Sequence, residues 1–189
     1  MNKKIIIPLA ILAVILPAIG VIVTEQTDSS IDMNSEKIHS IMEVSKIERS
    51  MSEILEKSQV IIEGTILSTE AISKQIDADS EREMIFTIAT VQVNQVLKGD
   101  IDSKIVKVQM FGGEMEKRIV EAPRMDVNKN DQVIMLLFSD PEADYLGGNY
   151  GLADWDKGIF KNENGSAKSF AETRSIPYDD LKEAIKLGK

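Results

Sequence analysis

Nineteen consecutive residues without a charge, Ile5 to Val23, follow Lys3 and Lys4 at the N-terminus. At about 1.5 Å per residue, a helix of this length spans roughly 28 Å, close to the hydrocarbon core of a bilayer. A segment so uniformly apolar has no polar face to present to water, which argues against a core helix of the folded domain. The two lysines favour a cytoplasmic N-terminus, so we expect the remainder of the chain to lie outside the cytoplasmic membrane.

Two interpretations of this apolar segment are open. It is either a retained membrane anchor or a signal peptide that is cut near the small residues of Ala18-Ile19-Gly20. The apolar run continues beyond that cut to Val23, which favours the anchor. In both cases the sequence predicts an extracytoplasmic protein, anchored by Ile5–Val23 or secreted after cleavage.

The chain beyond Val23 is strongly acidic and lacks cysteine. It has 20 basic and 31 acidic side chains, a formal charge of −11. Such a surface repels phosphate backbones, so nucleic acid is not an expected partner. The absence of cysteine excludes disulfides, thiolate metal sites and cysteine nucleophiles.

A polar segment and an amphipathic stretch precede the body of the chain. Apolar residues recur there every three or four positions, at Ile38, Ile41, Val44, Ile47, Met51 and Ile54. This spacing predicts one apolar face of a helix. Ser50 and Glu53 carry the signature of a capping box, which predicts a short helix from about Met51 to Lys57. We therefore expect a linker and stalk over residues 24–49 and a folded domain over residues 50–189.

Apolar patterns predict four strands in this domain, over residues 58–70, 84–100, 104–113 and 132–138. Gly64 in the first strand predicts a bend or a neighbouring backbone close by. The apolar phase slips between Val93 and Val96, which is typical of a β-bulge. The last run, "QVIMLLF", is apolar on both faces and should be buried on both.

The C-terminal part predicts a hairpin and a helix. Residues 157–162 and 166–170 flank Asn164-Gly165, which favours a tight hairpin turn. Tyr178, Leu181 and Ile185 share one face of a last helix. Residues 114–131 are expected to form a polar crossing. Together these patterns predict a mainly β protein. We expect a small antiparallel five-stranded barrel with an N-terminal transmembrane or signal helix and a C-terminal helix. A β-sandwich is the alternative.

The order of these pieces is distinctive. The chain contains "VIIEGTI", then "VQVNQVLKGD", a strand that ends in "GG", a polar crossing, "DQVIMLLF" and a late "GIF". This order resembles the OB-like barrels of the netrin and metalloproteinase-inhibitor type, as in small exported prokaryotic domains, over about Ser58 to Gly165. The resemblance implies a fold and is silent on activity. Those inhibitors reach a protease metal through an N-terminal cysteine that this chain lacks, so no functional residue is carried over.

Acidic residues form two candidate cation sites. In "DVNKND", residues 126–131, oxygen side chains alternate as in a calcium loop, but the glycine and glutamate that such a loop needs are Asp131 and Leu137 here. We therefore interpret it as a turn. A second set could hold calcium with backbone carbonyls, or form a solvated acidic rim. Its members are Asp140, Glu142, Asp144, Asp154 and Asp156.

Catalytic motifs are missing from the sequence. The only histidine, His39, lies in the predicted stalk, where we expect it to be exposed, and no nucleophile elbow, phosphate loop or zinc-protease motif occurs. We therefore expect a non-enzymatic protein without a cofactor. Two alternatives are a hydrolase that uses carboxylates alone and a calcium-binding envelope protein.

Three aromatic residues, Tyr145, Tyr150 and Trp155, are the candidates for a binding surface. Exposed, they could stack on a sugar or grip a peptide; buried, they would close one end of the barrel. The sequence thus predicts a membrane-tethered or secreted binding domain whose partner is a protein or a cell-surface polymer.

Overall fold

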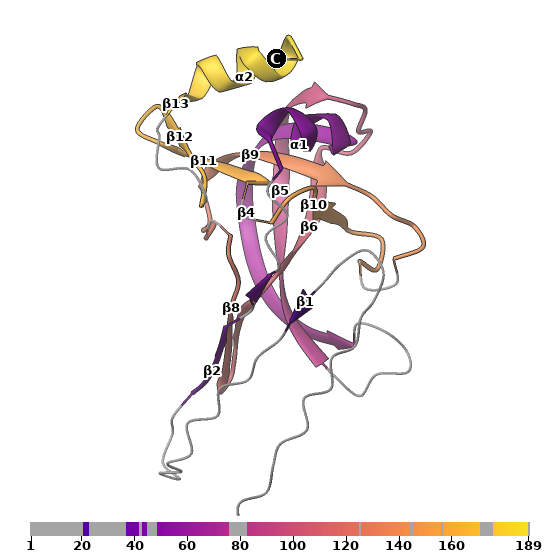
Figure 1. The fold of residues 1–189 in the computed structure, drawn as a ribbon, viewed down its shortest axis with the longest axis vertical. Helices are drawn as coiled ribbons and strands as arrows, with labels where there is room; N and C mark the ends of the chain where they lie inside the picture. Colours follow the sequence, from indigo (N-terminus) through magenta and orange to yellow (C-terminus); the bar gives the residue numbers. More distant parts are fainter. Residues whose placement is uncertain are drawn as a thin grey trace, which may run out of the picture.

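The computed structural model describes residues 21–22, 37–41, 43–44, 49–75, 83–124, 126–143, 146–155, 157–170 and 176–188. The protein is mainly β (Figure 1). Its two described helices are α1 (Met51–Lys57) and α2 (Tyr178–Lys186), and α2 is the predicted C-terminal helix. Neither of these helices has the length and apolar character that a bilayer crossing requires.

An eight-stranded sheet forms the body of the protein. Its strand order is β10-β6-β5-β4-β9-β11-β12-β13. The strands are β4 (Val60–Gln75), β5 (Glu83–Lys98), β6 (Ile105–Phe111), β9 (Gln132–Phe138), β10 (Tyr150–Leu152), β11 (Ile159–Glu163), β12 (Ser166–Lys168) and β13 (Ile176–Pro177).

Five of these strands form a circuit of pairings, because β10 pairs with β9 as well as with β6. The circuit runs β4-β5-β6-β10-β9 and back to β4. It is not the clean antiparallel barrel that the sequence predicted. The short strand β10 meets each neighbour through two residue pairs and lies parallel to β6. In addition, β4 and β5 continue together as far as the pair Gln75–Glu83, and β11, β12 and β13 widen the sheet beyond β9.

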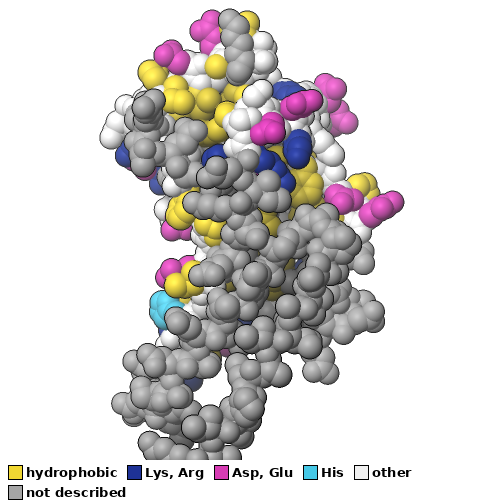
Figure 2. All heavy atoms as spheres, in the orientation of Figure 1, with side chains coloured by type: hydrophobic (Ala, Val, Ile, Leu, Met, Phe, Trp, Pro, Cys, Tyr) yellow, Lys and Arg dark blue, Asp and Glu magenta, His cyan; other side chains and the backbone are white. Residues whose placement is uncertain are grey.

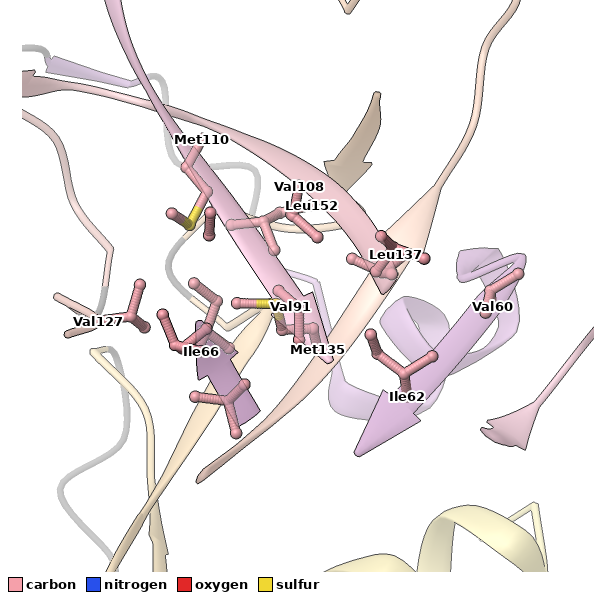
Figure 3. Close-up of a cluster of buried hydrophobic side chains, with 14 residues drawn as sticks. Val60, Ile62, Ile66, Val91, Val108, Met110, Val127, Met135, Leu137 and Leu152 are labelled. Atoms are coloured by element: carbon pink, nitrogen blue, oxygen red, sulfur yellow. The ribbon is translucent and has the colours of Figure 1, made fainter. Parts of the chain in front are cut away.

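β9 and the first part of β4, Val60 to Ile66, bury residues on both of their faces. Side chains on a strand alternate between the two faces of its sheet. On one face, Ile62 and Met135 belong to a cluster enclosed by the five strands, which we call the inner cluster (Figure 3). On the other face, Ile61 and Ile134 pack with residues of α1 and α2 in a second cluster, the helix cluster. The predicted two-sided burial of residues 132–138 is therefore confirmed.

The irregularities of the β4–β5 ribbon agree with the sequence. Its pairing register shifts at three places, one of which skips Asn94 and another Leu97, so the predicted bulge is present. A Cβ atom on Gly64 would lie 2.5 Å from Val91 Cγ1 and 2.8 Å from the carbonyl oxygen of Gln92. The predicted close approach at Gly64 is thus confirmed, and it allows the ribbon to bend sharply.

Helix α1 begins at the predicted capping box. The amide of Glu53 donates to the Ser50 hydroxyl at 3.3 Å, and the amide of Ser50 donates to the Glu53 carboxylate at 2.7 Å. The C-terminal hairpin is also confirmed. β11 and β12 pair across Asn164 and Gly165, whose φ angles of 54° and 84° suit the expected tight turn.

A second, three-stranded sheet was not foreseen. It contains β2 (Ile38–Ile41), β8 (Arg118–Glu121) and β7 (Gly113–Met115), with β2 parallel to β8. We call it the small sheet. The helix predicted from the apolar spacing is wrong for residues 38–41, because these residues pair with β8, some 80 positions later in the chain. The predicted polar crossing likewise contains the β7–β8 hairpin.

The N-terminal segment is described only at its end. Most of Ile5–Val23 lies outside the described residues. Val21 and Ile22 form strand β1, which pairs antiparallel with β3 (Glu43–Val44). These two residues are extended, so the helix predicted through Val23 does not include them.

We predict that Gly64→Ala destabilises the fold by about 1–3 kcal/mol, since the added methyl group would meet the Val91 side chain and a backbone carbonyl. Chemical denaturation measures the change. Ser68→Ala, at an exposed position of the same strand, is the control and should cost little. Equal stability of the Gly64→Ala variant and the parent chain would contradict the close approach.

The capping box predicts a pH effect at Glu53. Hydrogen bonds from the backbone and side chain of Ser50 hold the pKa of Glu53 below its ordinary value of 4.5. Because the folded pKa is depressed, the stabilisation is present above the unfolded pKa and is lost as pH falls through the folded pKa. Ser50→Ala removes the hydroxyl that bonds the Glu53 carboxylate and should raise the pKa of Glu53 measured by NMR titration. Ser52→Ala, at the exposed serine next to Glu53, is the control and should leave this pKa unchanged. An unchanged pKa in Ser50→Ala would refute the box.

Candidate functional site

A groove of about 400 Å³ lies beside the first residues of β6, before the point at which β6 pairs with β10. We call it the β6–β10 groove. Its lining comes from the loop before β6, the first residues of β6 and the segment that leads into β10. These residues are Ile101, Asp102, Ser103, Ile105, Val106, Lys107, Gly148, Asn149 and Tyr150.

The groove exists because β10 starts late along β6. Its first residue, Tyr150, is paired with Val108, so the described pairings leave Ile105 to Lys107 with β5 on one edge and no strand on the other. The carbonyl of Lys104 accepts a hydrogen bond from Val93 of β5. Backbone groups alternate along a strand, so those of Ile105 point to the open edge.

Ser103 covers this open edge with its side chain. Its hydroxyl donates to the carbonyl oxygen of Ile105 at 2.6 Å and accepts from the amide of the same residue at 3.2 Å. A hydroxyl thus takes the place of a neighbouring strand, which blocks strand addition at that residue. A ligand of this groove would therefore contact mainly side chains.

The lining of the groove combines apolar and charged side chains. Ile101 and Tyr150 are partly buried against the inner cluster, and Ile105 is 52% exposed. Asp102 and Lys107 are exposed. Such a surface can hold an aliphatic group and pair with one charge of each sign. Its described lining contains one carboxylate, that of Asp102, whereas glycoside cleavage needs two.

The two described aromatic candidates, Tyr150 and Trp155, have different surroundings. Tyr150 lines the groove, but Trp155 is half-buried and stacked on Phe111, with ring centroids 3.9 Å apart and planes at 10°. Phe111 also contacts the buried Phe86 at 4.8 Å between centroids. Trp155 therefore continues an internal aromatic row. Tyr145 lies outside the described residues.

Arg124 supports this aromatic row, and sequence reasoning missed it. Its guanidinium donates to the carbonyl oxygen of Phe111 at 2.7 Å and to the Thr87 hydroxyl at 3.0 Å, and lies 3.4 Å from the Asp126 carboxylate. Burial lowers the pKa of Arg124, although arginine remains charged at neutral pH. An arginine in a polar segment gives no sequence signal of burial, because its partners lie on β5 and β6.

The three described acidic candidates, Asp140, Glu142 and Asp154, do not form a metal-binding group. Asp140 is exposed, and its carboxylate accepts from the Glu142 amide at 3.0 Å, as in an ordinary turn. Asp154 is 8% exposed, accepts from the Lys157 amide at 3.3 Å and lies 3.7 Å from the Arg49 guanidinium.

The remaining candidates, Asp144 and Asp156, lie outside the described residues. Within the described part of the chain, no three acidic or histidine side chains lie together as a metal site would require. On the face shown in Figure 2, Asp and Glu side chains are scattered.

The segment "DVNKND" forms a turn. The Asp131 carboxylate accepts from the Asn128 amide at 2.7 Å and forms an ion pair with Lys161 at 2.8 Å. Asn130 adopts a φ of 73°, the left-handed conformation that asparagine tolerates in turns. Asp126, the one carboxylate among the alternating oxygen positions, lies 3.4 Å from the Arg124 guanidinium.

His39 lies on β2 and is exposed, as expected, although in a strand and not in a helical stalk. Its Nδ1 atom is 3.8 Å from the Glu121 carboxylate on β8.

No known family model matches the chain, and no curated protein shows significant similarity to it.

We predict that Phe111→Leu shifts the fluorescence emission of Trp155, the only tryptophan, to the red and increases its quenching by acrylamide. The substitution removes the ring on which the indole is stacked. Phe170→Leu, at a phenylalanine that is 54% exposed, is the control and should leave both properties unchanged. Identical spectra for the two variants would contradict the stack.

Proposed function

We propose that this protein is a non-enzymatic binding domain tethered to the outer side of the cytoplasmic membrane, and that its β6–β10 groove binds a segment of a partner protein. The observation that carries the proposal is the groove itself, an open surface lined by an exposed isoleucine and by one acidic and one basic side chain.

The fold supports a binding role. We propose that the circuit of β4, β5, β6, β10 and β9 is an OB-like barrel, widened by three more strands. Its five members and its weak closure through β10 agree with the five-stranded, partly open barrels of that class. In such barrels ligands bind on a strand face and the adjoining loops, and the groove lies on the loop before β6 and its first residues.

The chemistry of the groove favours a polypeptide over a glycan. Glycan sites present the faces of aromatic rings, but Tyr150 packs against the inner cluster and Trp155 stacks on Phe111. The accessible apolar surface is the aliphatic side chain of Ile105. Lys107 beside it would pair with an acidic residue of the ligand, and Asp102 with a basic one.

The tether is supported by the sequence. Ile5–Val23 follows two lysines, and the chain after it is acidic and free of cysteine. Strand β1 takes up Val21 and Ile22 at the end of the apolar run. The 16 uncharged residues from Ile5 to Gly20 remain for a helix, which would span about 24 Å. That length is close to the lower limit of a single crossing.

The proposal is tested by photocrosslinking from the groove. The full chain would carry p-benzoylphenylalanine at position 105 and be expressed in the organism that produces it. We expect a discrete adduct above the 21.0 kDa chain, because position 105 lines the groove. Lys107→Glu in the same chain should strongly reduce the adduct by reversing the charge beside the probe.

The control is the same probe at Leu187, which is 59% exposed and lies at the end of α2. It should give no adduct of that mass. The same adducts from both positions, or none from position 105, would count against a binding role for the groove.

A further inference from the structure

The small sheet exposes two isoleucines on a single short strand. Ile38 is 62% and Ile41 63% exposed, and both belong to β2. Residues three apart on a strand point to opposite faces of the sheet. In the described strand order β2 is an edge strand, so both side chains border its open edge. A partner that covers this edge would bury both of them.

The pairing of β1 with β3 places this edge beside the end of the apolar segment. Ile22 is paired with Glu43, which follows Ile41 by two residues. With strands about 5 Å apart and a rise of about 3.4 Å per residue, Ile41 lies on the order of 10 Å from Ile22. If the apolar segment occupies a bilayer, β2 is therefore held at the bilayer surface.

The charge of the small sheet also suits this position. Its described residues, 37–41 and 113–121, contain three basic residues, Lys37, Lys117 and Arg118, and three acidic residues, Glu114, Glu116 and Glu121. The formal charge of −11 of the chain beyond Val23 is thus carried entirely by other parts. An anionic membrane repels those parts and leaves the small sheet as the favoured surface of approach.

Polar contacts join β2 to its neighbours on this surface. Lys37, just before β2, forms an ion pair with Glu114 on β7, and the Nδ1 atom of His39 lies 3.8 Å from the Glu121 carboxylate on β8. The side chains of all four residues are about half exposed or more. Figure 1 shows β2 and β8 toward one end of the long axis and α1 and α2 at the other. In Figure 2 the histidine lies at the surface beside hydrophobic and acidic side chains.

We infer that the small sheet is a lipid-contact surface: it rests with the β2 edge on the bilayer, and Ile38 and Ile41 enter the boundary between headgroups and acyl chains. This inference rests on the proposed tether and concerns a site distinct from the β6–β10 groove. The free backbone groups of the β2 edge stay in the hydrated headgroup layer, because unpaired amides are excluded from hydrocarbon. The two isoleucines are the apolar anchors of a shallow contact.

Site-specific fluorescence tests the inference on the full chain. Because the chain has no cysteine, one introduced cysteine carries an NBD label uniquely. The variants are Ile38→Cys, Ile41→Cys, Ile105→Cys and Leu12→Cys, each reconstituted in vesicles of phosphatidylcholine and phosphatidylglycerol with nitroxide lipids. Position 105 is a matched control, an isoleucine of similar exposure in a strand of the body. Circular dichroism and Trp155 emission verify that each variant folds.

We expect shallow nitroxides to quench the labels at positions 38 and 41 about twofold or more, and the label at position 105 little. The label at position 12 reports the tether itself and should be quenched by deep nitroxides. If the label at position 12 is quenched but the labels at positions 38 and 41 are quenched no more than the label at position 105, the lipid contact alone is overturned. A second protein that covers β2 would give this result. No quenching at position 12 would overturn the tether and, with it, the lipid contact.

Discussion

The fold depends on the pairing of one strand, β4, on both edges and its packing on both faces. Its edges are taken by β5 and β9, and its faces by the inner cluster and the helix cluster. Ile61 and Ile62 are adjacent in sequence but are fully buried in different clusters. A strand held in this way cannot shift its register by one residue without exchanging the two clusters. The circuit of strands and the two helices are therefore fixed by the same short segment.

The open features of the protein arise where this support ends. On the side of the circuit away from β4, the short strand β10 connects β6 with β9. Because β10 begins to pair with β6 only at Val108, the β6–β10 groove is left beside the first residues of β6. The described pairing of β4 with β9 ends at Thr65, and the small sheet lies against the continuing β4–β5 ribbon, since a Cβ atom on Gly113 would meet Thr87 and Ala71. The proposed protein-binding and lipid-contact surfaces both belong to these margins, where strand edges lack the neighbours that the centre has.

Local chemistry explains which features the sequence predicted. The capping box, the Asn164-Gly165 turn and the apolar run 132–138 depend on residues a few positions apart, and all three are present. In the small sheet Ile38 is paired with Arg118, and a pattern of neighbouring residues does not indicate a contact over 80 positions. The apolar spacing of residues 38–41 was therefore interpreted as a helix. The candidate site was predicted at one residue, Tyr150. The lining residues from Ile101 to Lys107 meet it because β6 and β10 are parallel neighbours. Arg124, which is largely enclosed by partners on β5 and β6, was missed because those partners are distant in sequence.

Closure of the strand circuit by β10 is the central structural claim, because the groove and the barrel both require it. Interstrand NOEs in solution test it directly. The structure predicts NOEs that connect Tyr150 with the region of Val108 on β6 and, in the same sample, Gly151 with Phe138 on β9. Contacts of β10 with only one of these strands would show an open sheet and contradict the account.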